Sequence, residues 1–203
     1  MRTILRCHIL RRNLLRRNIV RRGLGFLPLL ATLTLVVAMT GTVLANSVHL
    51  KGGPHAAPAF IDNGLTLTAA GALAGLGFQD LQVNLSATAN PTAVCANNGN
   101  NQAPCQNPAP VTVTGSVAIP ASAIKNGNAP FTVTTTPPTS PIPGAPDCPN
   151  PNWTETITDM AFTSATITVE QPVGTLVLTV TCTFSVQTAD GAVPTGTVSC
   201  TSS

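Results

Sequence analysis

The side chains with the most distinctive chemistry in this sequence are its cysteines. Five of them lie well beyond the start of the chain: Cys95, Cys105, Cys148, Cys182 and Cys200. No two have the Cys-x-x-Cys spacing, and none of the five has a lysine or arginine beside it that would lower its pKa for catalysis. We therefore predict structural disulfides, at most two of them, with one cysteine left over and no catalytic or metal-binding cysteine.

The other reactive side chains do not form a recognisable site. His49 and His55 lie six residues apart without a carboxylate cluster, which favours solvated histidines over a metal pair. Glu155 and Asp159 have the spacing of one strand face, where we expect two solvated side chains rather than an acid pair. The glycine-rich stretch 71–77 lacks the lysine of a phosphate loop, so a turn is expected there. We predict no enzyme activity, no catalytic residue, no metal and no cofactor.

Positive charge is concentrated at the beginning of the chain. All eight arginines occur within the first 22 positions, ahead of an apolar run and a small-residue site that ends at Ala45. This order of regions is typical of a secretory signal peptide. We predict a signal peptide over residues 1–45, cleavage before Asn46, and a single secreted domain over 46–203. Repeated arginine pairs leave the twin-arginine export route open, and an uncleaved leader would act as a membrane anchor.

The secreted part differs in charge from the whole chain. The formal net charge of +3 becomes −5 once the leader is removed, because only Lys51 and Lys125 then oppose seven carboxylates. Such a chain has no basic surface for a phosphate backbone. We predict no nucleic-acid partner, and contact with a membrane only through the leader if it stays uncleaved.

Apolar and polar residues alternate with a period of two through most of the secreted part. The clearest segments are 81–88, 111–119, 131–134, 165–170 and 176–186. One face of each segment is Leu, Val, Ile, Phe or Ala, and the other is mainly Thr, Ser, Asn or Gln. Strands with a single apolar face form antiparallel sheets that are solvated on one side. We predict an all-β fold, an antiparallel two-sheet β-sandwich of immunoglobulin-like general architecture with about 8–10 strands.

The connections between these strands are of two kinds. The segments 171–174 and 190–191 contain the Pro and Gly residues of hairpin turns. Two connections are long, the Asn/Pro-rich loops at about 90–110 and 137–151. Loops of this length are either functional or inert, and the sequence leaves both readings open. They are the first place to search for a binding surface.

Strand phase limits the disulfide pairing without deciding it. Cys95 and Cys182 both take the core-facing phase of the runs they extend, which permits a bridge between the sheets. Cys105 could close a local ring with Cys95 instead. A two-residue turn at Asp190-Gly191 puts Cys200 on the face opposite Cys182, so a Cys182–Cys200 bridge requires a bulge or an odd-length loop.

Several segments of the secreted part resemble the sequences of a known group of proteins. The strings "GLTLTAAGALAGLG", "NQAPCQNPAPVTVTGSVAIP" and "PGAPDCPNPNWTETITD" resemble a group of small exported bacterial proteins. The resemblance covers nearly all of the chain after the leader. It implies a bacterial, exported protein and carries over no activity, cofactor or site residue.

Three classes of function fit these observations. A structural or surface-associated module, secreted or held at the cell surface, requires only a stable sandwich and export. A module that binds glycan or cell wall through the Pro/Asn-rich loops is the alternative, although stacking platforms need aromatic residues and the chain has one tryptophan, Trp153. A secreted hydrolase is third. The Thr-x-Thr faces also invite an ice-binding interpretation, but threonine favours strands in general and sheets twist. A pocket formed jointly by Trp153 and the two long loops would favour binding or catalysis.

Overall fold

The computed structural model describes residues 47–53, 56–106 and 108–203. The predicted signal peptide, its cleavage site at Ala45 and Asn46, and His55 lie outside the described residues. Nearly all regular structure is strand, in the order β1 (His49–Leu50), β2 (Ala59–Asp62), β3 (Leu67–Ala74), β4 (Leu81–Ala96), β5 (Gln102–Pro104), β6 (Val111–Ile119), β7 (Asn128–Thr134), β8 (Thr154–Glu170), β9 (Leu176–Phe184), β10 (Gly191–Ala192) and β11 (Val198–Ser202). Two short 3₁₀ turns, η1 (Ala121–Ala123) and η2 (Thr195–Thr197), complete the elements. In the part of the chain that the structure describes, no helix is long and apolar enough to cross a membrane.

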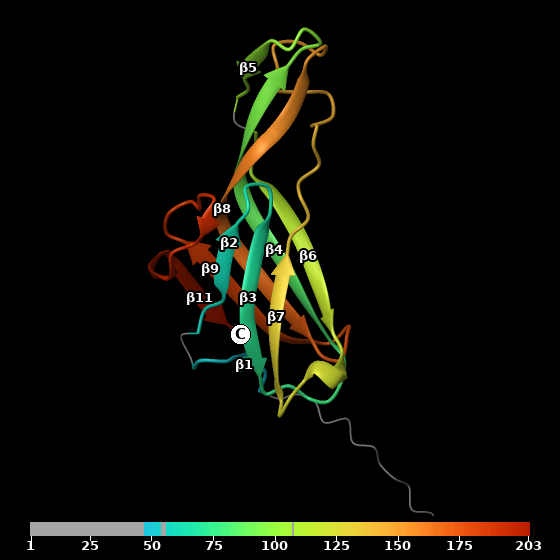
Figure 1. Cartoon of the computed structure of the whole chain (residues 1–203), viewed down its shortest axis with the longest axis vertical. Helices are drawn as coiled ribbons and strands as arrows, with labels where there is room; N and C mark the ends of the chain where they lie inside the picture. Colours follow the sequence, from blue (N-terminus) through green and yellow to red (C-terminus); the bar gives the residue numbers. More distant parts are fainter. Residues whose placement is uncertain (1–46, 54–55, 107) are drawn as a thin grey trace, which may run out of the picture. The chain divides into compact units, whose positions relative to one another are not determined.

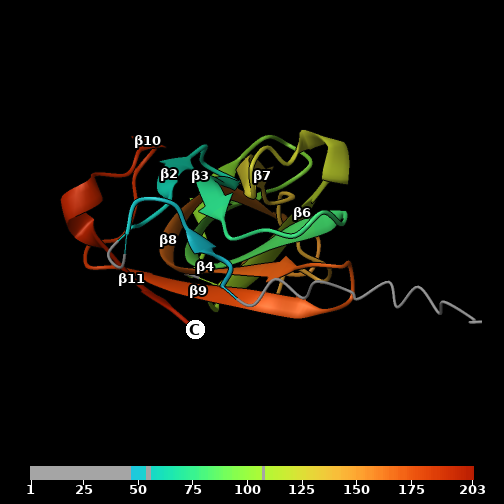
Figure 2. The same ribbon diagram turned by 90° about the horizontal axis from the view of Figure 1, so that it is seen from below.

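The strands form two antiparallel sheets that pack face to face, as the end-on view in Figure 2 shows. The five-stranded sheet has the order β1-β3-β2-β10, with β7 also paired to β3. The six-stranded sheet has the order β11-β9-β8-β4-β5, with β6 also paired to β4. The predicted all-β sandwich is confirmed.

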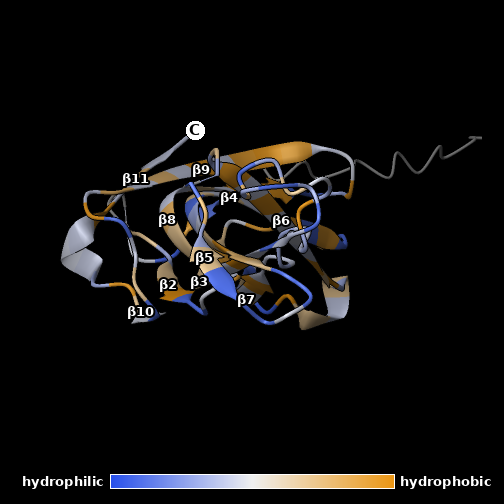
Figure 3. Ribbon diagram, turned by 90° about the horizontal axis from the view of Figure 1, so that it is seen from above, coloured by the Kyte–Doolittle hydropathy of each residue, from blue (hydrophilic) through white to orange (hydrophobic). Residues whose placement is uncertain are grey.

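The core between the sheets follows the period-two pattern of the sequence. On β4, the side chains of Leu81, Val83 and Leu85 are buried, while the intervening polar side chains are half-exposed. In Figure 3 the hydrophobic colours run mostly along the strands and the hydrophilic colours gather in the connections. β9 begins at Leu176 as predicted but ends at Phe184, two residues earlier than predicted, and Leu176 and Val186 do not join the core. Leu176 and Val186 are 59% and 64% exposed, because Leu176 lies beyond a register shift against β8 and Val186 follows the end of the strand.

Two glycines allow close packing inside this sandwich. Gly71 lies within β3 rather than in the predicted turn, and a Cβ there would stand 2.9 Å from the ring of Phe131 on the neighbouring β7. Gly115 on β6 lets the backbone at Thr134 pass directly over it. The amide of Thr136 then donates to the carbonyl of Thr114, 2.8 Å away, and so joins the edges of the two sheets.

The strands β4 and β8 continue well past the sandwich as a two-stranded arm. β6 covers β4 only as far as Ala89, whereas β8 stays paired to β4 as far as Ala96. With β5, this arm forms the extension at the top of Figure 1. The predicted loop at 90–110 is therefore partly strand. Pro91 is tolerated there because β4 has lost one neighbour and lies between two irregularities of its pairing with β8.

The two predicted hairpin turns have different outcomes. The segment 171–174 does connect β8 to β9, and the amide of Gln171 donates to the carbonyl of Thr175 at 2.9 Å. The segment 190–191 is not a two-residue turn. Gly191 and Ala192 form β10, which pairs with β2 in the opposite sheet. The chain from β9 to β11 crosses to the other layer and returns.

Candidate functional site

The outer face of the six-stranded sheet carries three parallel rows of small polar side chains. We call these fifteen positions the hydroxyl face: Ser116, Asn84, Thr168, Thr179 and Ser203; Thr114, Ser86, Thr166, Thr181 and Thr201; Thr112, Thr88, Ser164, Thr183 and Ser199. Within each row, the five residues stand opposite one another across β6, β4, β8, β9 and the chain end at β11. All but Asn84 carry a hydroxyl group, and none is buried.

Strand geometry makes this face regular. Neighbouring strands lie about 4.8 Å apart, and alternate residues along one strand lie about 6.8 Å apart. Adjacent side chains also contact one another, as between the hydroxyls of Thr88 and Thr112 at 3.2 Å. At the border of this face, the carboxylate of Glu170 accepts from the Asn84 amide at 3.3 Å. The hydroxyl face itself carries no charge, so the hydrogen bonds that its side chains can form are neutral.

A proline-lined groove adjoins the hydroxyl face at Thr112 and Thr114. It has a volume of about 630 Å³ and takes lining residues from both long loops, including Pro110 and Pro138. A second hollow of about 550 Å³ lies over the hydroxyl face and shares Thr114 and Thr136 with this groove. The two loops therefore converge, but Trp153 does not join them. It lines a separate hollow of about 410 Å³ beside Pro151.

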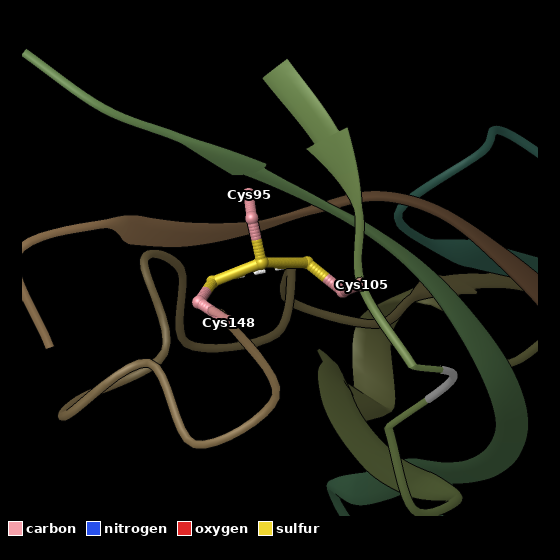
Figure 4. Close-up of side chains that lie close together, drawn as sticks. All are labelled: Cys95, Cys105 and Cys148. Atoms are coloured by element: carbon pink, nitrogen blue, oxygen red, sulfur yellow. Dashed lines mark hydrogen bonds between the residues drawn. A yellow bond between two sulfur atoms is a disulfide. The ribbon is translucent and has the colours of Figure 1, made fainter. Parts of the chain in front are cut away.

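Three cysteines meet on the arm. Cys95 is buried on β4, Cys105 follows β5 directly, and Cys148 lies in the proline-rich loop. Their sulfur atoms all lie within 4.8 Å of one another, and Figure 4 shows the Cys95 sulfur between the other two. Three thiolates at this spacing could also hold a soft metal ion such as Zn²⁺ or Cu⁺. A disulfide within the cluster removes two of those ligands.

The remaining two cysteines form a cross-strand disulfide. Cys182 on β9 and Cys200 on β11 stand directly opposite each other, with their Cα atoms 4.1 Å apart. This pairing is possible because the connection 185–197 has an odd number of residues. The structure thus contains no bridge between Cys95 and Cys182, which lie on strands of the same sheet.

Glu155 differs most from its expected position. It is fully buried rather than solvated on an outer face, and it stands opposite Cys95 across the β4–β8 pair. Its Oε2 accepts from the Asp147 amide at 3.4 Å, whereas Oε1 has no hydrogen-bond partner. Asp159 is exposed, because the pairing of β8 with β4 shifts between Ile157 and Asp159 and reverses the phase of the strand.

A second buried carboxylate was not foreseen from the sequence. Asp62 ends β2 and is 2% exposed. It accepts from the Gly64 amide at 2.9 Å and from the Thr188 hydroxyl, which in turn accepts from the amide of Phe162. Burial, with a smaller contribution from the nearby Asp159 and Asp190, raises the pKa of Asp62. The polar pair Asp62–Thr188 ties the β9–β11 connection to both sheets, which is a structural role. The only signal for it in the sequence is the Asp-Asn-Gly turn at 62–64.

No protein-family model, no curated protein and no solved structure matches this chain. What defines its class is the fold, an all-β sandwich with two antiparallel sheets. Within the described residues, the candidate functional features are the hydroxyl face, the proline-lined groove and the cysteine cluster of the arm.

Proposed function

We propose that the protein is an exported structural module of the cell surface, without catalytic activity, that attaches to neutral surface polymers through its hydroxyl face. The observation that supports this proposal best is the composition of that face. Fifteen facing positions on five adjacent strand segments carry a hydroxyl or an amide and no charge. Solubility alone does not explain this composition, because charged side chains would keep the outer face of a sandwich equally soluble.

Such a face suits attachment to a polymer rather than recognition of one small molecule. Each hydroxyl both donates and accepts a hydrogen bond, and each such bond exchanged with water stabilises a complex by only about 1 kcal/mol. Useful affinity then requires many contacts repeated along an extended partner, as a polysaccharide of the cell wall would provide. The pattern also argues against nucleic acid, because it offers no cation to the phosphates.

The test is adsorption of the purified protein to insoluble neutral polysaccharides and to cell-wall preparations. Thr166 lies in the middle row of the hydroxyl face, and we expect Thr166→Lys and Thr166→Glu each to weaken retention by about tenfold, equivalent to ~1.4 kcal/mol. Thr132 is an exposed threonine on β7 of the other sheet, so Thr132→Lys and Thr132→Glu are matched controls that should bind normally. Absence of retention would contradict the proposal, and so would opposite effects of the two charges, which indicate simple ionic adsorption.

A second candidate function is the binding of a soluble glycan in the proline-lined groove. It is supported by the convergence of the two long loops on one concavity of about 630 Å³. Thr139 is exposed and lines this groove. Titration with cell-wall oligosaccharides should show binding that Thr139→Arg abolishes and Thr166→Lys leaves intact. The reverse pattern would assign binding to the hydroxyl face.

A further inference from the structure

The cysteine cluster of the arm has an odd number of sulfur atoms. Of the five cysteines in the described residues, Cys182 and Cys200 bond to each other. Cys95, Cys105 and Cys148 remain, and each sulfur can form only one disulfide. A fully oxidised cluster therefore consists of one disulfide with one thiol directly beside it.

The geometry allows Cys95 to bond to either neighbour. The Cα atom of Cys95 lies 5.6 Å from that of Cys105 and 5.7 Å from that of Cys148. Both values lie in the usual range for disulfides, about 4.4–6.8 Å. The sulfur atoms of Cys105 and Cys148 are 3.9 Å apart. Neither pairing requires the backbone to move.

We propose that Cys95 exchanges between two disulfides, one with Cys105 and one with Cys148, and that the thiol left over is a covalent attachment site for a disulfide-bearing partner. In the exchange, the Cys105 thiolate attacks the Cys95 sulfur and the new Cys95–Cys105 bond forms. The Cys95–Cys148 bond breaks, and Cys148 leaves with the electron pair and takes up a proton. One disulfide is made and one is lost, so no oxidant or reductant is consumed.

Burial determines which cysteine carries the thiol. Cys95 is fully buried, whereas Cys105 and Cys148 are both half-exposed. Because Cys95 takes part in both disulfides, the thiol always falls on an accessible residue.

The two states restrain different segments of the arm. The Cys95–Cys105 bond spans 10 residues and closes the β4–β5 hairpin. The Cys95–Cys148 bond spans 53 residues and ties the proline-rich loop to the arm. In either state, the half-exposed thiolate can attack a partner's disulfide, form a mixed disulfide and release the partner's second sulfur as a thiolate. This inference is independent of the proposed role of the hydroxyl face.

Alkylation of the purified, unreduced full-length protein carrying Cys7→Ser tests the proposal, because Cys7 in the arginine-rich leader would otherwise take up a second tag. A thiol-specific mass tag should add once per chain, and peptide mapping should locate it on Cys105 in some molecules and on Cys148 in the others. Incubation with glutathione disulfide, a minimal disulfide partner, should add one glutathione per chain at the same two residues. In Cys105→Ser and in Cys148→Ser, the remaining pair forms a fixed disulfide, so both tagging and glutathione addition should be lost.

Three results would overturn the proposal. Tagging confined to one of the two residues, even after long incubation, would mean a fixed disulfide and no exchange. Tagging of Cys95 in the folded protein would contradict its place in both disulfides. Three reduced thiols with bound zinc or copper in the purified protein would identify the cluster as a metal site. Denatured, unreduced protein supplies the control count of total thiols.

Discussion

Removal of the Cys182–Cys200 disulfide should destabilise the sandwich by an amount that follows from its place in the chain. The bond joins residues 18 positions apart. The chain-entropy relation then gives about 3 kcal/mol for the loss of this restraint on the unfolded state. For a domain of this size, that corresponds to a fall in melting temperature of about 6–12 °C.

The variant that isolates this effect is the double substitution Cys182→Ala/Cys200→Ala. A single substitution would leave a free thiol that could pair with the cluster on the arm. Because Cys182 is fully buried and Cys200 is half-buried, loss of packing around Cys182 adds to the entropic term. A matched control is Thr181→Ala/Thr201→Ala, which truncates the neighbouring cross-strand pair on the solvent side.

Thermal melts and denaturant titrations, in oxidising and then in reducing buffer, measure the difference. The double cysteine variant should melt well below the unmodified protein in oxidising buffer, and the control pair should change little. The reasoning would be refuted if the cysteine variant melted within about 2 °C of the unmodified protein, since even the smallest expected loss exceeds that shift.

Three further predictions concern other parts of the chain. Because the pKa of Asp62 is raised in the folded state, Asp62 ionises first in the unfolded chain as the pH rises. The free energy of unfolding should therefore fall with rising pH from just above 3.8 until the pKa of the folded state is passed. Denaturant titrations should show this fall in the unmodified protein and not in Asp62→Asn. Gly71→Ala should destabilise by about 1–3 kcal/mol, because the new Cβ meets the Phe131 ring, whereas Gly196→Ala, with open space around it, should be near neutral in the same melts. Exported protein should begin at Asn46 by intact mass, because Ala45 ends a signal-peptidase site; any other N-terminus would disprove that cleavage.

The local alternation of residue types was sufficient to predict the class of fold. Segments such as 81–88 and 165–170 have one apolar face each, and these faces form the core. The same alternation placed threonine and serine on the outside of several strands. That these positions line up in three rows could not be predicted, because register depends on the partner strand and on its irregularities.

The candidate sites depended more strongly on tertiary structure. Pro91 and the asparagines that follow it indicate a loop, yet β4 runs through Pro91 because β8 accompanies it along the arm. The phase of Glu155 relative to Asp159 depends on a pairing irregularity that leaves no mark in the composition. Glu155 was therefore expected in solvent and is instead buried opposite Cys95.

The alternation of residue types shows which segments have one apolar face, and therefore that two sheets, each solvated on its outer side, enclose one core. Five cysteines follow the arginine-rich segment in the sequence. Because this number is odd, disulfides among these five must leave one cysteine over. Which cysteines meet depends on how the distant segments pair in the folded protein. Cys182 faces Cys200 because the connection between their strands, which passes through β10 on the other sheet, has an odd number of residues. Cys95, Cys105 and Cys148 meet because the arm brings together segments up to 53 residues apart. Pairing between distant segments depends on loop path and strand register, and neither is encoded in the local pattern of residues.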